Sequence, residues 1–323
     1  QHNNDLAAVS LSGNQTPTVG VSYDYVVSVF NAGINAQTSY SVSLMSGTTE
    51  LATVVGPALS PLATALVTIP WVPGTAGATS IRGKVSFAGD ENTANNETEA
   101  MSLMVQPEGM AAITIGDGSQ LARRPIDVSY RNSMFETIFP ASEIPINGTL
   151  TGLTFYSDFT ETCPNVQTKI WLGTTTQSSL ASGWIPAYQL VQVFDGSVNY
   201  LSGQNSVNIT FNTATPFTYN GGNLVMLVNR PMSTSFYSVN NRFQCQTIGT
   251  NRSRMAFSDV TTYDPNNMGT IGSASGQFPK TTFYMQTGAN EPAFSIDPQS
   301  HNFGQVIINN SASQSFTVYN SGG

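Results

Sequence analysis

The chain has 323 residues, of which 40% are hydrophobic and only 9% are charged, and its net charge is −8. This length exceeds one ordinary sandwich and suits two or three domains with packed cores. Thr, Ser, Asn and Gly replace the charged residues, which make up about 25% of a typical soluble protein, and this composition favours strands and turns over helices. The 11 basic residues form no basic run, and no segment approaches the ~18 apolar residues of a membrane span. Nucleic acid and direct membrane insertion are therefore poor candidates as partners.

Residues 1–106 show the pattern of repeated short strands. The stretch "SYDYVVSVFNAG" alternates large and small side chains and stops at a turn-forming Asn-Ala-Gly. "ATALVTIPWV" and "SIRGKVSFAG" follow, separated by the turn sequence "PGTAG". Strands at this spacing predict a β-sandwich, in which we expect Trp71 to be the largest core residue.

The same residues resemble a known family. The stretches that carry the resemblance are, in order, "NDLAAVSLSG", "TPTVGVSYDYVVSVFNAG", "LSPLATALVTIPWVPGTAG" and "ENTANNETEAMSLMV". They follow the pattern of the CARDB module, a bacterial domain that is related to cell adhesion. The resemblance covers residues 4–106 and implies an immunoglobulin-like sandwich over residues 1–106.

Residues 107–287 contain longer and more aromatic strands. The clearest are "LTGLTFYSDF", "VQTKIWLGTTT", "LVQVFDGSVNYL", "NSVNITFN" and "NLVMLVNRP", with a turn at Asn220-Gly221 and at most a short helical turn in 139–145. "YRNSMFETIFPASEI", "GTLTGLTFYS" and "ITFNTATPFTYNGGNLVMLV" resemble a jelly-roll-like domain of large proteins that Bacteroidota export by the type IX route. The family's acidic, Asn-rich segment after its "NLV" strand is replaced here by "VNRPMSTSF". The resemblance implies a second β-sandwich and contact with the type IX machinery during export.

Residues 288–323 resemble the opening of a third module. "NFGQV" and "FTVYNSGG" are similar to the hydin-like, or choice-of-anchor D, immunoglobulin type of bacterial surface proteins. About three strands are too few to close a sandwich alone. The sequence therefore predicts an all-β chain of tandem sandwiches: immunoglobulin-like, jelly-roll-like and partial immunoglobulin-like. We expect it to be the N-terminal part of a longer protein.

Cys163 and Cys245 are the only cysteines in the chain. An even count in a loop-rich β-chain fits an oxidising compartment, so we expect a Cys163–Cys245 disulfide that braces the middle module. Two buried free thiols are the alternative.

Residues that could carry catalysis are scarce. The only histidines are His2 and His301, near opposite ends of the chain, so a Ser–His–Asp or Cys–His mechanism and a zinc site are disfavoured. "GATSIRGKV" superficially resembles a phosphate loop but predicts a strand. Paired carboxylates remain conceivable for a glycosidase, and the candidates are Asp127, Glu136, Glu143, Asp158 and Glu161. Asp158 and Glu161, in "YSDFTETCPN", are more simply loop residues that bind turn amides, and no motif supports catalysis by the others, so we expect neither an enzyme nor a cofactor.

The stretch "GDENTANNETEA" concentrates oxygen-bearing side chains in residues 89–100. Calcium prefers several oxygen ligands on a flexible loop, but this stretch has no EF-hand register. Asn and Asp also form turns by binding their own backbone. We therefore predict a turn without a metal, with calcium as the alternative.

Three aromatic residues could stack on sugars: Trp184, Tyr188 and Tyr219. Core packing is the simpler interpretation of such rings in a sandwich. Our prediction is a non-catalytic structural or adhesive region of a large protein secreted to the bacterial cell surface, with glycans or neighbouring subunits as partners. The alternative is a carbohydrate-binding accessory region of a secreted multidomain hydrolase whose catalytic domain lies outside this chain. Exposed, coplanar rings at Trp184 and Tyr188 would favour the alternative.

Overall fold

The computed structural model describes residues 2–287, 294–297, 313, 315 and 317–320. The chain forms two compact units, Gln1–Thr287 and Gly288–Gly323. Strands dominate, and the described helices are three short 3₁₀ turns, η1 (Thr93–Asn95), η2 (Ala141–Glu143) and η3 (Ala187–Gln189). The predicted all-β fold class is confirmed, and the short helical turn expected within 139–145 is η2. No described helix has the length and apolarity needed to cross a membrane.

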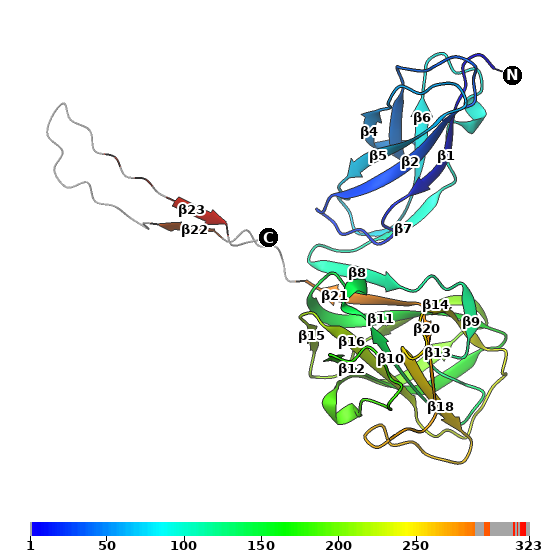
Figure 1. Cartoon of the computed structure of the whole chain (residues 1–323), viewed down its shortest axis with the longest axis vertical. Coiled ribbons are helices and arrows are strands. Elements are labelled where there is room, and N and C mark those ends of the chain that lie inside the picture. Colours follow the sequence, from blue (N-terminus) through cyan, green and yellow to red (C-terminus); the bar gives the residue numbers. More distant parts are fainter. Residues whose placement is uncertain (1, 288–293, 298–312, 314, 316, 321–323) are drawn as a thin grey trace. The chain divides into compact units, whose positions relative to one another are not determined.

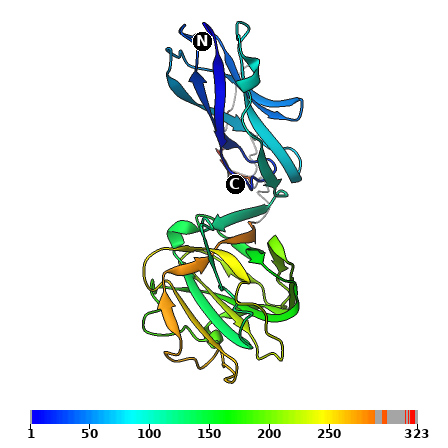
Figure 2. The same cartoon turned by 90° about the vertical axis from the view of Figure 1, so that its right-hand side faces the viewer.

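The first unit begins with a sandwich of a three-stranded and a four-stranded sheet, both antiparallel (Figures 1 and 2). The first sheet has the order β1 (Leu6–Ser12), β2 (Tyr23–Asn31), β5 (Thr64–Trp71). The second has the order β4 (Thr49–Val55), β3 (Ser41–Ser46), β6 (Gly77–Ser86), β7 (Met101–Val105). The stretch that superficially resembles a phosphate loop is strand β6, as predicted.

Strand β2 shows why the alternation in the sequence specifies this sandwich. Tyr25, Val27 and Val29 point inward and are fully buried, and the residues between them are partly exposed. The expectation that Trp71 is the largest core residue is wrong, because Trp71 ends β5 opposite Tyr23 and stays half-buried. Tyr25 is the largest fully buried side chain of this sandwich, and its ring lies 5.8 Å from that of Trp71.

The second sandwich packs two larger antiparallel sheets together. The six-stranded sheet has the order β13 (Val191–Tyr200), β12 (Cys163–Thr175), β16 (Asn223–Arg230), β10 (Asn132–Phe139), β18 (Ser253–Ser258), β19 (Ser273–Ser275). The main path of the eight-stranded sheet is β20 (Gln277–Pro279), β17 (Arg242–Thr247), β11 (Gly148–Phe159), β21 (Thr281–Gln286), β8 (Met110–Ile115). Off this path, β14 (Gly203–Thr210) and β15 (Phe217–Tyr219) pair with β11, and β9 (Gln120–Ala122) pairs with β17. The five strands predicted in this region are β11, β12, β13, β14 and β16.

Strand β10 is buried along its whole length, which distinguishes it from the alternating strands. Phe135 and Phe139 face the core between the two sheets. Met134 and Ile138 face the opposite side, where they pack against residues of segments 176–190 and 259–272. These two segments, the covering loops, therefore bury the outer face of the six-stranded sheet.

The second unit contains β22 (Phe294–Asp297) and β23 (Thr317–Asn320), which pair antiparallel (Figure 1). The other residues that carry the hydin-like resemblance, and His301, lie outside the described residues.

Candidate functional site

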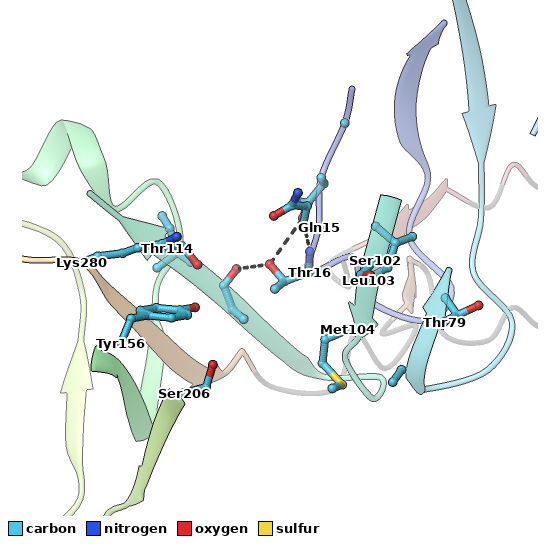
Figure 3. A pocket seen from close by; sticks show the side chains of 15 residues that line it. Gln15, Thr16, Thr79, Ser102, Leu103, Met104, Thr114, Tyr156, Ser206 and Lys280 are labelled. Atoms are coloured by element: carbon cyan, nitrogen blue, oxygen red, sulfur yellow. Dashed lines mark hydrogen bonds between the residues drawn. The ribbon is translucent and has the colours of Figure 1, made fainter. Parts of the chain in front are cut away.

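A cleft with a volume of about 890 Å³ lies in the first unit. One wall comes from the first sandwich, with residues 13–16, strand β6 and strand β7. The other comes from the second sandwich, with strands β8 and β11 and Lys280 (Figure 3). Its lining carries mainly hydroxyl and amide groups.

Threonine hydroxyls join the two walls of the cleft at the free edge of β8. Thr16 Oγ1 donates to the carbonyl of Ala112 over 3.3 Å, and Thr18 Oγ1 donates to that of Met110 over 2.9 Å. An exposed strand edge invites pairing with another chain, and occupied carbonyls reduce that risk. These contacts connect the two sandwiches and protect an edge.

The cleft offers polar groups of several kinds. Tyr156 Oη lies 2.7 Å from Thr282 Oγ1, and Lys280 Nζ lies 4.6 Å above the Tyr156 ring. The other polar side chains that line the cleft carry hydroxyl or amide groups. These groups can hold a polar ligand by hydrogen bonds.

The three predicted glycan-contacting rings do not form a platform. Tyr219 is fully buried in the core between the sheets, and its hydroxyl donates to Gly222 O over 2.6 Å. Trp184 lies in the first covering loop and is half-buried, and its Nε1 donates to Ile271 O of the second covering loop over 2.7 Å. Only Tyr188 is well exposed, with 72% of its surface accessible. Core packing, the simpler interpretation, is therefore correct for Tyr219, because β15 alternates and turns Phe217 and Tyr219 into the sandwich, and the possible sugar contact of Tyr219 is contradicted.

Several of the candidate carboxylates have structural partners. Glu143 forms an ion pair with Arg252, with 2.8 Å between Oε1 and Nη1, and Asp127 lies 3.4 Å from Arg123. Glu161 accepts from Ser238 N over 2.6 Å. No group of three or more His, Cys, Asp or Glu side chains in the described part of the chain is placed to hold a metal.

Glu136 is the most unusual of these acids. It is fully buried beneath the covering loops, and burial raises the pKa of its carboxyl to about 8. Its Oε2 accepts from Ile185 N over 2.9 Å, while Oε1 has no partner among the described residues. Such a carboxyl is neutral over most of the range below pH 8.

Arg254 lies directly opposite Glu136 on the neighbouring strand β18. Its guanidinium donates to carbonyls of both covering loops at 2.7 to 3.2 Å, namely those of Leu180, Ala181, Thr270, Ile271 and Gly272. Arg254 therefore ties the loops to the sheet and is used structurally. Sequence reasoning did not single it out.

The two cysteines are free thiols in the structure, so the predicted Cys163–Cys245 disulfide is wrong. Cys163 begins β12 of one sheet and contacts Asn241 Nδ2 at 3.3 Å, whereas Cys245 lies within β17 of the other and contacts Arg124 O at 3.7 Å. Burial raises the pKa of each thiol to about 12. Each sulfur therefore packs as a small apolar group with its own partner.

Reducing agents are expected to leave the melting temperature of the chain unchanged. The denatured, unreduced chain should take up two alkyl groups from iodoacetamide, and the native chain none, because both thiols are buried. Mass spectrometry measures both. A denatured chain that resists alkylation until it is reduced would contradict the free thiols.

The segment 89–97 forms a turn, as predicted. Asp90 Oδ1 accepts from Asn92 N over 2.9 Å, and its Oδ2 accepts from Leu6 N over 3.3 Å. Asn95 Nδ2 donates to Asp5 Oδ1 over 2.8 Å. The side chains of this segment thus bind the backbone and anchor the beginning of β1.

Substituting Asp90 by Ala is expected to destabilise the first sandwich by about 1–2 kcal/mol, since two backbone N–H groups lose their acceptor. Chemical denaturation measures the loss. Asp24→Ala is the control, because Asp24 is exposed on β2 and should change stability little. If the segment is a turn without a metal, added CaCl₂ or EDTA should shift neither midpoint. A midpoint that rises with calcium only in the unsubstituted chain would support the calcium alternative.

Comparisons with known proteins give only partial likenesses. No family model and no curated protein matches the chain. The CARDB domain of a Pyrococcus furiosus protein, solved in complex with di-metal ions, is 22% identical, covers 33% of this chain and 98% of its own, and has a TM-score of 0.29. A domain assigned to a cell-surface protein of Methanosarcina acetivorans is 23% identical, covers 32% of this chain and 91% of its own, and has a TM-score of 0.28. Each of these likenesses is confined to about a third of the chain.

Proposed function

We propose that this chain is a non-catalytic structural and adhesive segment of an extracellular cell-surface protein. The observation that supports this most is the use of buried charge. Arg254 binds five loop carbonyls, and Arg230 donates to the carbonyls of Tyr130 and Ser235. Charges buried in this way brace loops against a sheet, which suits a rigid spacer.

Arg252 adds a third brace of the same kind. Its guanidinium pairs with Glu143 and lies 3.6 Å from the centre of the Phe278 ring. Cation–π contacts and charge-assisted hydrogen bonds are strongest where water is excluded, and Arg252 is only 7% exposed. Rigid modules with low surface charge fit the display of a binding surface at a distance from the cell.

The route to the surface is part of the same proposal. The resemblance of residues 115–285 to type IX cargo suggests export by that machinery in Bacteroidota. Glycans or neighbouring copies of the protein are the proposed partners. The CARDB likeness of the first sandwich agrees with adhesion but adds no ligand.

Protease treatment of intact cells of the source organism tests the location. We expect the chain to be cut or released from whole cells while a cytoplasmic marker stays intact, and deletion of its gene to weaken attachment to surfaces. Protection of the chain in whole cells would disprove the surface location. Turnover of any member of a broad glycan and peptide panel by the purified chain would disprove the non-catalytic role.

The alternative is a carbohydrate-binding accessory region of a secreted hydrolase. The hydroxyl-rich cleft with Tyr156 favours it more than the predicted rings do, since Tyr219 is buried. Affinity electrophoresis in neutral polysaccharide gels compares the unsubstituted chain with Tyr156→Ala and Tyr188→Ala. Retardation that only the Tyr156 variant loses would support the cleft as a sugar site, and retardation lost in the Tyr188 variant would support the exposed ring.

A further inference from the structure

Three arginines meet in a pocket of about 310 Å³ in the second sandwich, which we call the arginine pocket. Its lining consists of Arg123, Arg124 and Arg242 with Asp127, Ala122, Met255 and Phe257. Three arginines against one aspartate leave a surplus of positive charge, in a chain that has only 11 basic residues and a net charge of −8. The pocket therefore departs from the charge of the whole molecule.

Strand pairing brings these residues together from distant parts of the sequence. Strands β9 and β17 are antiparallel, with Ala122 opposite Phe243. Arg123 directly follows β9 and Arg242 is the first residue of β17, so the pairing of these strands brings the two arginines close together in the lining of the pocket. Met255 and Phe257 of β18 reach the pocket from the other sheet.

The donors of the pocket are incompletely used. Arg123 Nη1 donates to Ser129 Oγ over 3.0 Å, and Arg124 Nη1 donates to Gln277 Oε1 over 2.6 Å. Arg124 Nε is buried without a partner, and the Arg242 guanidinium has no hydrogen-bond or ion-pair partner among the described residues. The carboxylate of Asp127 is already in use, because its Oδ1 accepts hydrogen bonds from both the N–H and the hydroxyl of Ser129. The buried Nε of Arg124 lacks an acceptor, which is unfavourable, and Asp127 at 3.4 Å from Arg123 is the one carboxylate of the lining, so an added anion would be attracted here.

The pocket also offers an apolar surface beside the charge. Phe257 is 42% exposed, and its ring lies 4.2 Å from that of Tyr130, which holds it in place. The planar fork of arginine matches the paired oxygens of a carboxylate or sulfate, and aromatic rings pack against the C–H face of a sugar. A volume near 300 Å³ is at the small end of ligand sites and suits one ring.

We propose that the arginine pocket binds the carboxylate or sulfate of an acidic sugar, with its ring against Phe257 and its anionic group between Arg242 and Arg123. This assignment goes beyond the structural role and does not depend on it. The proposed ligand also differs from the neutral sugar considered for the cleft, because the arginines of this pocket would select an anionic sugar.

Titration of the full chain with glucuronate, glucose, acetate and sulfate, followed by calorimetry and NMR, tests the proposal. Glucuronate is expected to bind, and its affinity should fall as salt is added. Glucose should bind at least about tenfold more weakly, because it lacks the anionic group. Arg242→Gln should lower the affinity for glucuronate by about tenfold or more. Arg242→Lys should lower it by less, because lysine keeps the positive charge but lacks the planar guanidinium. Arg131→Gln is the matched control, since Arg131 is exposed, outside the pocket and over Phe236.

Thermal denaturation at low salt separates binding from folding. Arg242→Gln should change the melting temperature little, because Arg242 has Arg123 as a neighbour of like charge and Asp158 of β11 as a neighbour of opposite charge. A variant that melts lower and also loses binding would indicate a structural role and overturn the assignment. Equal binding of acetate, sulfate and glucuronate would mean an adventitious ion only. Absence of glucuronate binding, or unchanged binding by Arg242→Gln, would also overturn the proposal.

Discussion

Replacement of Glu136 by Gln is expected to stabilise the second sandwich at pH 7 by about 2–3 kcal/mol and to remove most of its pH dependence. The pKa of Glu136 rises from its ordinary value of 4.5 to about 8 because the carboxyl is buried. The unfolded chain releases this proton near pH 4.5, whereas the folded chain keeps it until about pH 8. Between these values the folded state binds more protons, so stability falls as pH rises, by up to about 1.4 kcal/mol per pH unit.

Gln keeps an oxygen that can accept from Ile185 N and never acquires a charge. Some of the gain is offset because its amide group replaces an oxygen that already lacks a partner. Denaturation with urea from pH 5 to pH 8 measures the effect. Glu108→Gln is the control, since Glu108 is exposed and should leave the pH profile unchanged. Parallel pH profiles for the unsubstituted chain and Glu136→Gln would show that Glu136 is charged at neutral pH.

Replacement of Arg254 by Met is expected to destabilise the second sandwich by about 3–5 kcal/mol. Met fills part of the space, but the carbonyls of both covering loops lose their donor, and buried carbonyls without partners are costly. Hydrogen exchange should accelerate at Ile185 and Trp184, whose N–H groups bind Glu136 and Gly269. Arg131→Met controls for the loss of an exposed arginine.

The two substitutions are coupled, which allows a sharper test. The charge of Arg254 lowers the pKa of Glu136 against the larger effect of burial. Arg254→Met should therefore raise that pKa further and extend the loss of stability to higher pH. The double variant with Glu136→Gln should lose this extension. Additive effects of the two changes at every pH would contradict a direct interaction between them.

Local patterns in the sequence predicted the strands well, for a physical reason. Large and small or polar side chains alternate along β2 because one face of the strand meets the core and the other meets water. The positions of Tyr25, Val27 and Val29 in the sequence therefore predict which face is buried. The turn at 89–97 was predictable because Asp and Asn bind their own backbone within a few residues. Features that depend on neighbours in sequence were thus accessible.

Features that depend on distant segments were not accessible in the same way. The burial of Glu136 requires two covering loops that no period in β10 reveals. The arginine pocket requires the pairing of β9 with β17, which brings Arg242 close to Arg123. Two cysteines in one domain do not specify a disulfide, because buried thiols such as Cys163 and Cys245 can each pack with a partner of their own.

The threonine contacts at the edge of β8 have a mechanical consequence. Two hydroxyl hydrogen bonds, each of about 1 kcal/mol, hold Thr16 and Thr18 to this strand, while each sandwich is held by whole ladders of backbone bonds. A pull on the chain would extend this joint at low force, and both sandwiches would remain folded. The joint would therefore act as a compliant link between the two sandwiches and would re-form when the tension is released.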